Sequence, residues 1–106
     1  MIRWLTLALL LIGIAPAQAQ SPKRVVTVNL CLDQLALRLA APGQLVGVSY
    51  LSLDPRISVQ VDKARAIAPV RATVESILEL RPDLVIFDSV AHANQKRLLR
   101  GAGVPL

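Results

Sequence analysis

The sequence predicts an α/β fold of three layers, in which a mostly parallel sheet is flanked by helices. Three observations carry this prediction. Short β-branched or apolar runs recur along the chain, stretches of helical periodicity separate them, and proline or glycine ends most of those stretches. Alternating strands and helices with short loops form right-handed crossovers, which make the strands parallel and place the helices on the faces of the sheet.

Residues 1–19 have the pattern of a secretory signal peptide and are set apart from the fold. Arg3 supplies a positive start, residues 4–14 are almost wholly apolar, and residues 17–19 (Ala-Gln-Ala) fit the small-x-small cleavage rule. The apolar run is shorter than the about 20 residues that span a bilayer. We therefore expect cleavage after Ala19, or two residues earlier at a second site of this kind. An uncleaved anchor or a buried helix is the alternative.

The distribution of the cationic residues argues against nucleic acid as a partner. The formal net charge is +5, and aromatic residues make up 3% of the sequence. The cationic residues are scattered along the chain, and no aromatic residues alternate with them. A nucleic-acid site would need a clustered basic surface, so we expect none.

The first repeat of strand and helix runs from residue 25 to residue 48. Residues 25–28 are β-branched and predict a strand, after which Asn29 is expected to cap a helix. Pro42 and Gly43 should end this helix, and residues 45–48 predict the second strand. The spacing i, i+3, i+4, i+7 indicates which side chains the helix buries. These are Leu32, Leu35, Ala36 and Leu39.

Two other residues of this helix have their own expectations. Cys31 is the one cysteine of the chain, so it cannot form an internal disulfide, and we expect a small buried residue at the helix start. Asp33 is expected in the first turn, where a carboxylate interacts favourably with the positive end of the helix dipole.

Residues 55–67 fit two patterns. Asp54 and Pro55 suit the N-cap and first position of a helix, and Ile57 and Val61 share a helical face. Alternation of apolar residues from Ile57 to Val61 would also suit a strand. We prefer a helix over residues 55–67.

A short helix and a buried strand follow between residues 73 and 89. Thr73 is a good N-cap, and Pro82 should end the helix by moving Arg81 out of the α region. Residues 84–87 are continuously apolar, which is typical of a strand covered on both faces. The helical spacing predicts one buried face. Its members are Val74, Ile77 and Leu78.

The last helix is predicted over residues 94–100. Leu98 and Leu99 are expected to point inward, and Gly101 occupies the C′ position. Val104 should begin a further strand.

Two parts of the sequence resemble a known family. Residues 74–86 (V-E-S-I-L-E-L-R-P-D-L-V-I) fit the segment V-E-x-[IL]-L-x-L-[RK]-P-D-L-V-[IL]. That segment is typical of the class III periplasmic substrate-binding proteins of ABC importers for iron-siderophore, haem and cobalamin complexes. Residues 24–35 and 45–49 are similar to the opening strand, helix and second strand of that family. The resemblance covers about residues 23–106.

The resemblance implies a Rossmann-like first lobe over residues 20–106. Family members join two such lobes by a long helix and bind ligand between them, so we expect the sequence to be a fragment or a truncated reading frame. It also implies a periplasmic, monomeric binding protein that is not an enzyme and has no cofactor. Its expected partners are a metal chelate (ferric siderophore, haem or corrinoid) and an ABC permease in the inner membrane.

The ligand-binding residues are expected at the carboxyl ends of the strands, where open α/β sheets bind ligands. This rule nominates Asn29, Tyr50, Leu51, Asp88 and Ser89. The resemblance adds Arg71, in the turn before the central helix. A tyrosine ring suits the face of a macrocycle, and an arginine suits an anionic chelate or a propionate.

Glu75 matches the glutamate that many family members present to basic residues of the permease. The resemblance therefore implies a docking role, and the alternative is a carboxylate that supports the helix dipole. His92 is the one histidine of the chain, and it argues against capture of a bare metal ion, which takes several His and carboxylate ligands.

Two other classes of function are alternatives for an α/β chain of this kind. A nucleotide-binding enzyme of Rossmann type is disfavoured, because no G-x-G-x-x-G or G-x-x-x-x-G-K-[ST] motif occurs. A stand-alone secreted module that binds a partner protein remains the alternative.

Overall fold

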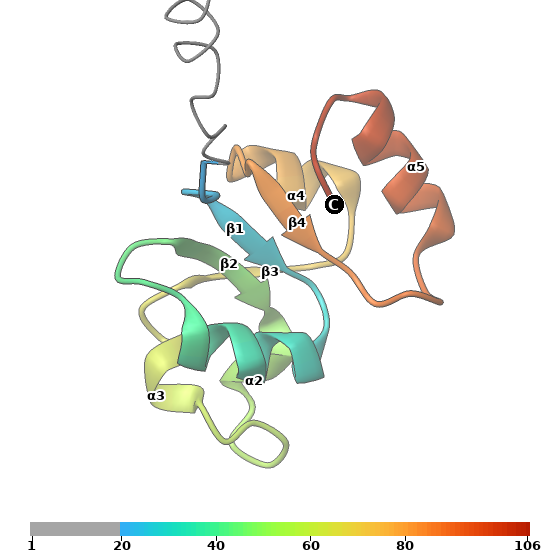
Figure 1. The fold of residues 1–106 in the computed structure, drawn as a ribbon. Helices are drawn as coiled ribbons and strands as arrows, with labels where there is room; N and C mark the ends of the chain where they lie inside the picture. Colours follow the sequence, from blue (N-terminus) through green and yellow to red (C-terminus); the bar gives the residue numbers. More distant parts are fainter. Residues whose placement is uncertain (1–19) are drawn as a thin grey trace, which may run out of the picture.

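The computed structural model describes residues 20–106 and contains one parallel four-stranded sheet, with strand order β3-β2-β1-β4 (Figure 1). The α/β class predicted from the sequence is therefore confirmed. The elements, in chain order, are β1 (Val25–Thr27), α2 (Leu30–Leu39), β2 (Leu45–Ser49), the 3₁₀ helix η1 (Tyr50–Leu53), α3 (Val61–Ala64), β3 (Ala68–Val70), α4 (Val74–Glu79), β4 (Leu84–Ile86) and α5 (Ala93–Gly101). The predicted signal peptide lies outside the described residues.

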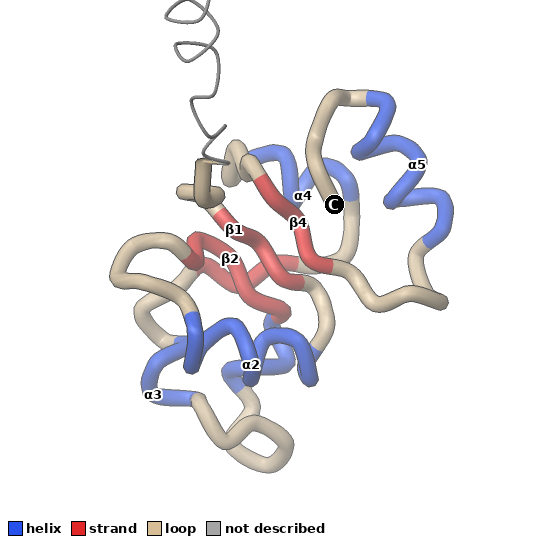
Figure 2. Tube along the Cα trace, viewed as in Figure 1, coloured by secondary structure: helices blue, strands red, loops and turns tan. Residues whose placement is uncertain are grey.

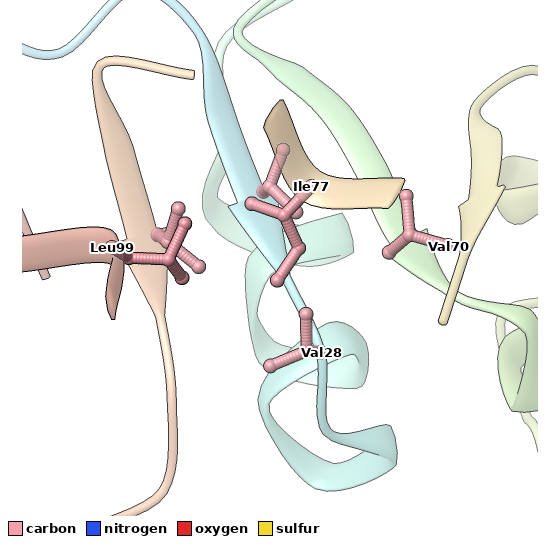
Figure 3. Packing of buried hydrophobic residues seen from close by; sticks show 6 residues of the cluster. Val28, Val70, Ile77 and Leu99 are labelled. Atoms are coloured by element: carbon pink, nitrogen blue, oxygen red, sulfur yellow. The ribbon is translucent and has the colours of Figure 1, made fainter. Parts of the chain in front are cut away.

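The helices form two layers on opposite faces of the sheet (Figures 1 and 2). Helices α2 and α3 pack with one core cluster, and α4 and α5 pack with the other. The first cluster consists of Val25, Leu37, Leu45, Val48 and Ala64. The second consists of Val26, Val28, Val70, Ile77, Val85 and Leu99, and Figure 3 shows its side chains between the sheet and α4 and α5. Because side chains alternate along a strand, Val25 and Val26 of β1 serve different layers.

Helix α2 begins as predicted but buries a different face. Asn29 caps it by accepting hydrogen bonds from the backbone nitrogens of Cys31 and Leu32. Leu35 and Leu39 are 56% and 74% exposed, so the prediction that they point inward is wrong. The buried residues of α2 are instead Asp33 and Leu37. Hydrogen bonds from Thr27 and Ser52 to Asp33 hold this face against β1 and η1.

Three more burial predictions are wrong. Cys31 is exposed rather than buried, because it lies on the side of α2 away from Asp33 and Leu37. In α4 the buried residue is Ile77 while Leu78 is exposed, and in α5 Leu99 is buried while Leu98 is exposed. Helices α4 and α5 each contact the sheet along a narrow stripe, so one residue of each adjacent apolar pair remains in solvent.

The predicted helix over residues 55–67 is also wrong. Residues 54–58 form a turn in which the Asp54 carbonyl accepts from the nitrogens of Ile57 and Ser58, and α3 spans Val61–Ala64. The following residues form β3, an edge strand that the sequence did not predict. Its Pro69 donates no backbone hydrogen bond, which an edge position tolerates.

The helix that follows Thr73 begins and ends as predicted. The Thr73 hydroxyl accepts from Ser76 N at 3.3 Å, and Arg81, before Pro82, has a φ of +49°. The Arg24 guanidinium donates to the carbonyls of Leu80 and Arg81, which caps the C-terminus of α4. Arg24 thereby fixes the end of this helix to the start of β1.

Strand β4 is not covered on both faces as predicted. Val85 is fully buried, whereas Leu84 and Ile86 are partly exposed. They line an open apolar groove of about 240 Å³ beside α2. Residues 104–106 are not assigned to a strand, although the Pro105 carbonyl accepts from Val85 N at 3.0 Å.

Candidate ligand-binding edge

Four of the predicted ligand residues follow four different strands at the same edge of the sheet. Because all strands are parallel, their carboxyl ends lie together, and the strand order fixes the order of the residues that follow them. Along the edge this order is Arg71, Tyr50, Asn29 and Asp88. We call this row of four residues the carboxyl edge.

Arg71 and Tyr50 are in contact at one end of the carboxyl edge. The guanidinium carbon of Arg71 lies 4.9 Å from the centre of the Tyr50 ring, which is a cation–π geometry. Both side chains are exposed, and Tyr50 is 48% accessible to solvent. They therefore offer an aromatic face and a positive charge side by side.

Asn29 and Asp88 are joined at the other end. Asn29 Nδ2 donates to Asp88 Oδ2 at 3.3 Å, while its side-chain oxygen caps α2. Asp88 also accepts from the backbone nitrogens of Val90 and Ala91, at 3.1 and 2.5 Å. These hydrogen bonds hold the pKa of Asp88 below its usual value of 3.8, and the bond from Ala91 lowers this pKa most. The Asp88 carboxylate thus stabilises the conformation of the loop between β4 and α5.

The remaining predicted residues of this site differ in their exposure. Leu51 is half-buried in η1, directly after Tyr50, and Ser89 is exposed in the β4–α5 loop. Lys96 was not predicted from the sequence, and its Nζ donates to the Asp88 carbonyl at 2.9 Å. The His92 and Phe87 rings lie 5.9 Å apart between centres in a tilted arrangement. No signal in the sequence marks the contact of Lys96 with this loop.

A buried polar network behind the carboxyl edge was also missed. Asp33 Oδ2 accepts from Ser52 Oγ at 2.8 Å, and Asp33 Oδ1 accepts from Thr27 Oγ1. Burial raises the pKa of Asp33 from 3.8, although the hydrogen bonds from Thr27 and Ser52 oppose this shift. The i, i+4 spacing of Asp33 and Leu37 places them on one helix face, but nothing in the sequence marks that face as the buried one.

Glu75 lies in the first turn of α4, one residue after Val74 and exposed to solvent. Helix α4 starts directly beyond β3, so Glu75 belongs to the same end of the sheet as Arg71. The two salt bridges among residues 20–106, Arg56–Asp54 and Arg65–Asp62, do not include Glu75.

Two features that residues 20–106 lack bear on the type of site. Residues 20–106 contain no group of three or more His, Cys, Asp or Glu side chains placed to hold a metal ion. Within the same range, no helix has the length and apolar character needed to cross a membrane.

Comparison with solved structures places the fold. A periplasmic haem-binding protein from Pseudomonas aeruginosa matches with a TM-score of 0.61 and 27% identity, over 80% of this chain and 30% of that one. The periplasmic haem-binding protein RhuT from Roseiflexus sp. RS-1 matches with a TM-score of 0.61 and 27% identity, over 81% and 33%. The periplasmic vitamin B12-binding protein BtuF of Vibrio cholerae matches with a TM-score of 0.58 and 26% identity, over 79% and 32%.

The protein has the class III periplasmic binding-protein fold. This confirms the resemblance drawn from residues 24–35, 45–49 and 74–86, and these structural neighbours are binding proteins rather than enzymes. The chain spans about one third of the length of those class III proteins. No family model and no curated protein sequence matches it.

Proposed function

We propose that this class III lobe is part of the periplasmic substrate-binding component of an ABC importer, and that it contributes one wall of a site for a metal chelate. The ligand class is a ferric siderophore, haem or a corrinoid, and an inner-membrane permease receives it. Haem- and vitamin B12-binding proteins among the structural neighbours support the ligand class.

The observation that carries the proposal is the contact between Tyr50 and Arg71. An exposed ring can stack on the face of a macrocycle, and the adjacent guanidinium can pair with a propionate or another anionic group of the chelate. Two different strands hold these residues at the edge where open α/β sheets bind ligands. An anionic, planar chelate such as haem fits this pair best.

Titration with haemin, cobalamin and a ferric siderophore tests the proposal. Tyr50 is the one tyrosine of the chain, so ring-labelled tyrosine reports on this residue alone in an NMR spectrum. We expect haemin to shift the Tyr50 signals, with a Kd no tighter than about micromolar, because one wall cannot bury most of a ligand's surface. A submicromolar Kd would instead indicate a self-sufficient binding lobe.

Substitutions make the test specific. Arg71→Ala should weaken haemin binding about tenfold, a loss of about 1.4 kcal/mol, by removing the charge beside the ring. Arg65→Ala is the matched control, because Arg65 is exposed at the end of α3 and pairs with Asp62. If none of the three chelates moves the Tyr50 signals, the proposal is wrong and a module that binds a partner protein becomes the better account.

A further inference from the structure

Asp33 is a fully buried carboxylate without an ion-pair partner. Its relative exposure is 0%, and neither salt bridge among residues 20–106 includes it. Removing a carboxylate from water is unfavourable, and an apolar residue at such a position often gives equal or greater stability. Stability of the core therefore does not explain why a carboxylate occupies this face of α2.

The partners of Asp33 belong to β1 and η1, which meet the carboxyl edge at Asn29 and Tyr50. Thr27, which ends β1, donates one hydrogen bond to it, and Ser52 donates another at 2.8 Å. Ser52 belongs to the single turn η1, whose first residue is Tyr50. The bond from Ser52 thus ties Asp33 to the turn that begins with Tyr50.

Gln34, the next residue of α2, also forms hydrogen bonds to the segment that follows η1. Gln34 Nε2 donates to Ser58 Oγ at 3.1 Å, and Gln34 Oε1 accepts from Val59 N at 3.1 Å. The first turns of α2 therefore restrain the loop from Ser49 to Val59 at several points. The same end of the helix is also fixed by its cap, Asn29, which donates to Asp88 at 3.3 Å.

We propose that Asp33 is a positioning residue of the ligand-binding edge. It holds η1 in the one orientation that places the Tyr50 ring against Arg71. It touches no ligand itself and acts through Ser52 and Tyr50. This role rests on the proposed function of the carboxyl edge, but its structural part does not depend on any ligand.

The NMR signals of ring-labelled Tyr50 test the role in the ligand-free full chain. Arg71→Ala gives the reference position of these signals when the cation is absent. Asp33→Asn keeps the side-chain shape but replaces one acceptor oxygen by a donor, so it cannot accept from both Thr27 and Ser52 as the carboxylate does. We expect it to move the Tyr50 signals by at least about half of the Arg71→Ala shift, because the ring leaves the cation.

Two further variants keep the experiment decisive. Ser52→Ala removes the hydroxyl that donates to Asp33 from η1. It should move the Tyr50 signals in the same direction as Asp33→Asn. It replaces Asp33→Asn in the test if that variant does not fold. Asp62→Asn is the control, because its side chain is 96% exposed on α3, and it should leave Tyr50 unchanged. A folded Asp33→Asn or Ser52→Ala protein with wild-type Tyr50 signals would overturn the proposal.

Haemin titration of the same variants separates the two proposals. If both stand, Asp33→Asn weakens haemin binding about tenfold, as Arg71→Ala does. If the Tyr50 signals move as expected but the wild-type chain binds no chelate, the positioning role stands and the proposed function fails.

Discussion

The leucines of α2 differ in what their burial contributes. Leu37 is 7% exposed and packs in the cluster under α2, whereas Leu35 on the same helix is 56% exposed. We expect Leu37→Ala to lower the free energy of unfolding by about 2–5 kcal/mol, because it leaves a cavity in the core. Leu35→Ala should change it by no more than about 0.5 kcal/mol. Urea denaturation followed by circular dichroism compares the two, and equal losses would contradict this assignment of the α2 face.

Asp83 predicts a pH dependence that can be assigned to one carboxylate. Hydrogen bonds from the backbone nitrogens of Lys23 and Arg24, at 2.8 and 2.9 Å, hold its pKa below the usual 3.8. A lowered folded-state pKa means that its stabilising effect is present above pH 3.8 and is lost as the pH falls through the folded value.

We therefore expect Asp83→Asn to be less stable than wild type at neutral pH. The difference should shrink as the medium is acidified below the folded pKa, where the wild-type carboxyl is also neutral. Denaturation midpoints of both proteins across the acid range measure this, and a difference that stayed constant would refute it. Asp33 has the opposite effect on the pH dependence of stability. Burial raises its pKa, so protonation of Asp33 favours the folded state.

At the scale of elements, α4 combines a structural and a proposed interaction role. Its N-terminus is capped by Thr73 and its C-terminus by Arg24, so the helix is fixed at both ends although it has six residues. Ile77 anchors it to the sheet, and Glu75 is left in solvent. A rigid helix that presents a carboxylate suits docking to a basic surface.

The proposed docking role of Glu75 is tested in a two-lobed binding protein that carries this lobe. Glu75→Gln should reduce reconstituted uptake at limiting binding-protein concentration while chelate affinity stays the same, because the charge that pairs with the permease is lost. If Glu75 only supports the helix dipole, uptake should be unchanged and stability should fall by less than about 1 kcal/mol. Glu79→Gln is the matched control, since Glu79 is exposed one turn further along α4.

At the scale of the whole molecule, the sheet is covered unevenly. Helices α4 and α5 lie on one face and α2 and α3 on the other (Figure 1). On the face of α2 and α3, an open groove remains beside β4. Leu39 at the rim of this groove is 74% exposed. The chain spans about one third of the length of the similar solved proteins. We expect the isolated lobe to be marginally stable, because a small domain buries a smaller share of its surface than a large one.

The sequence by itself determined the elements whose signals are local. The β-branched run before Asn29, the Thr73 cap and the stop at Pro82 each depend on neighbouring residues, and the structure has them where they were predicted. The position of the candidate site followed from the same information, because parallel strands bring their carboxyl ends to one edge. Its individual residues and their proposed roles remain predictions.

Tertiary structure alone decided which helix faces are buried and where β3 forms. Apolar spacing could not show that α2 turns Asp33 and Leu37 inward, because that orientation depends on Thr27 and Ser52, which lie on other elements. Strand β3 has three residues including a proline, and it becomes a strand by pairing with β2. The contact between Tyr50 and Arg71 likewise required the sheet order, since it joins two residues that follow neighbouring strands. Long-range contacts of this kind leave no periodic signal in the chain, so they appear only once the sheet has assembled.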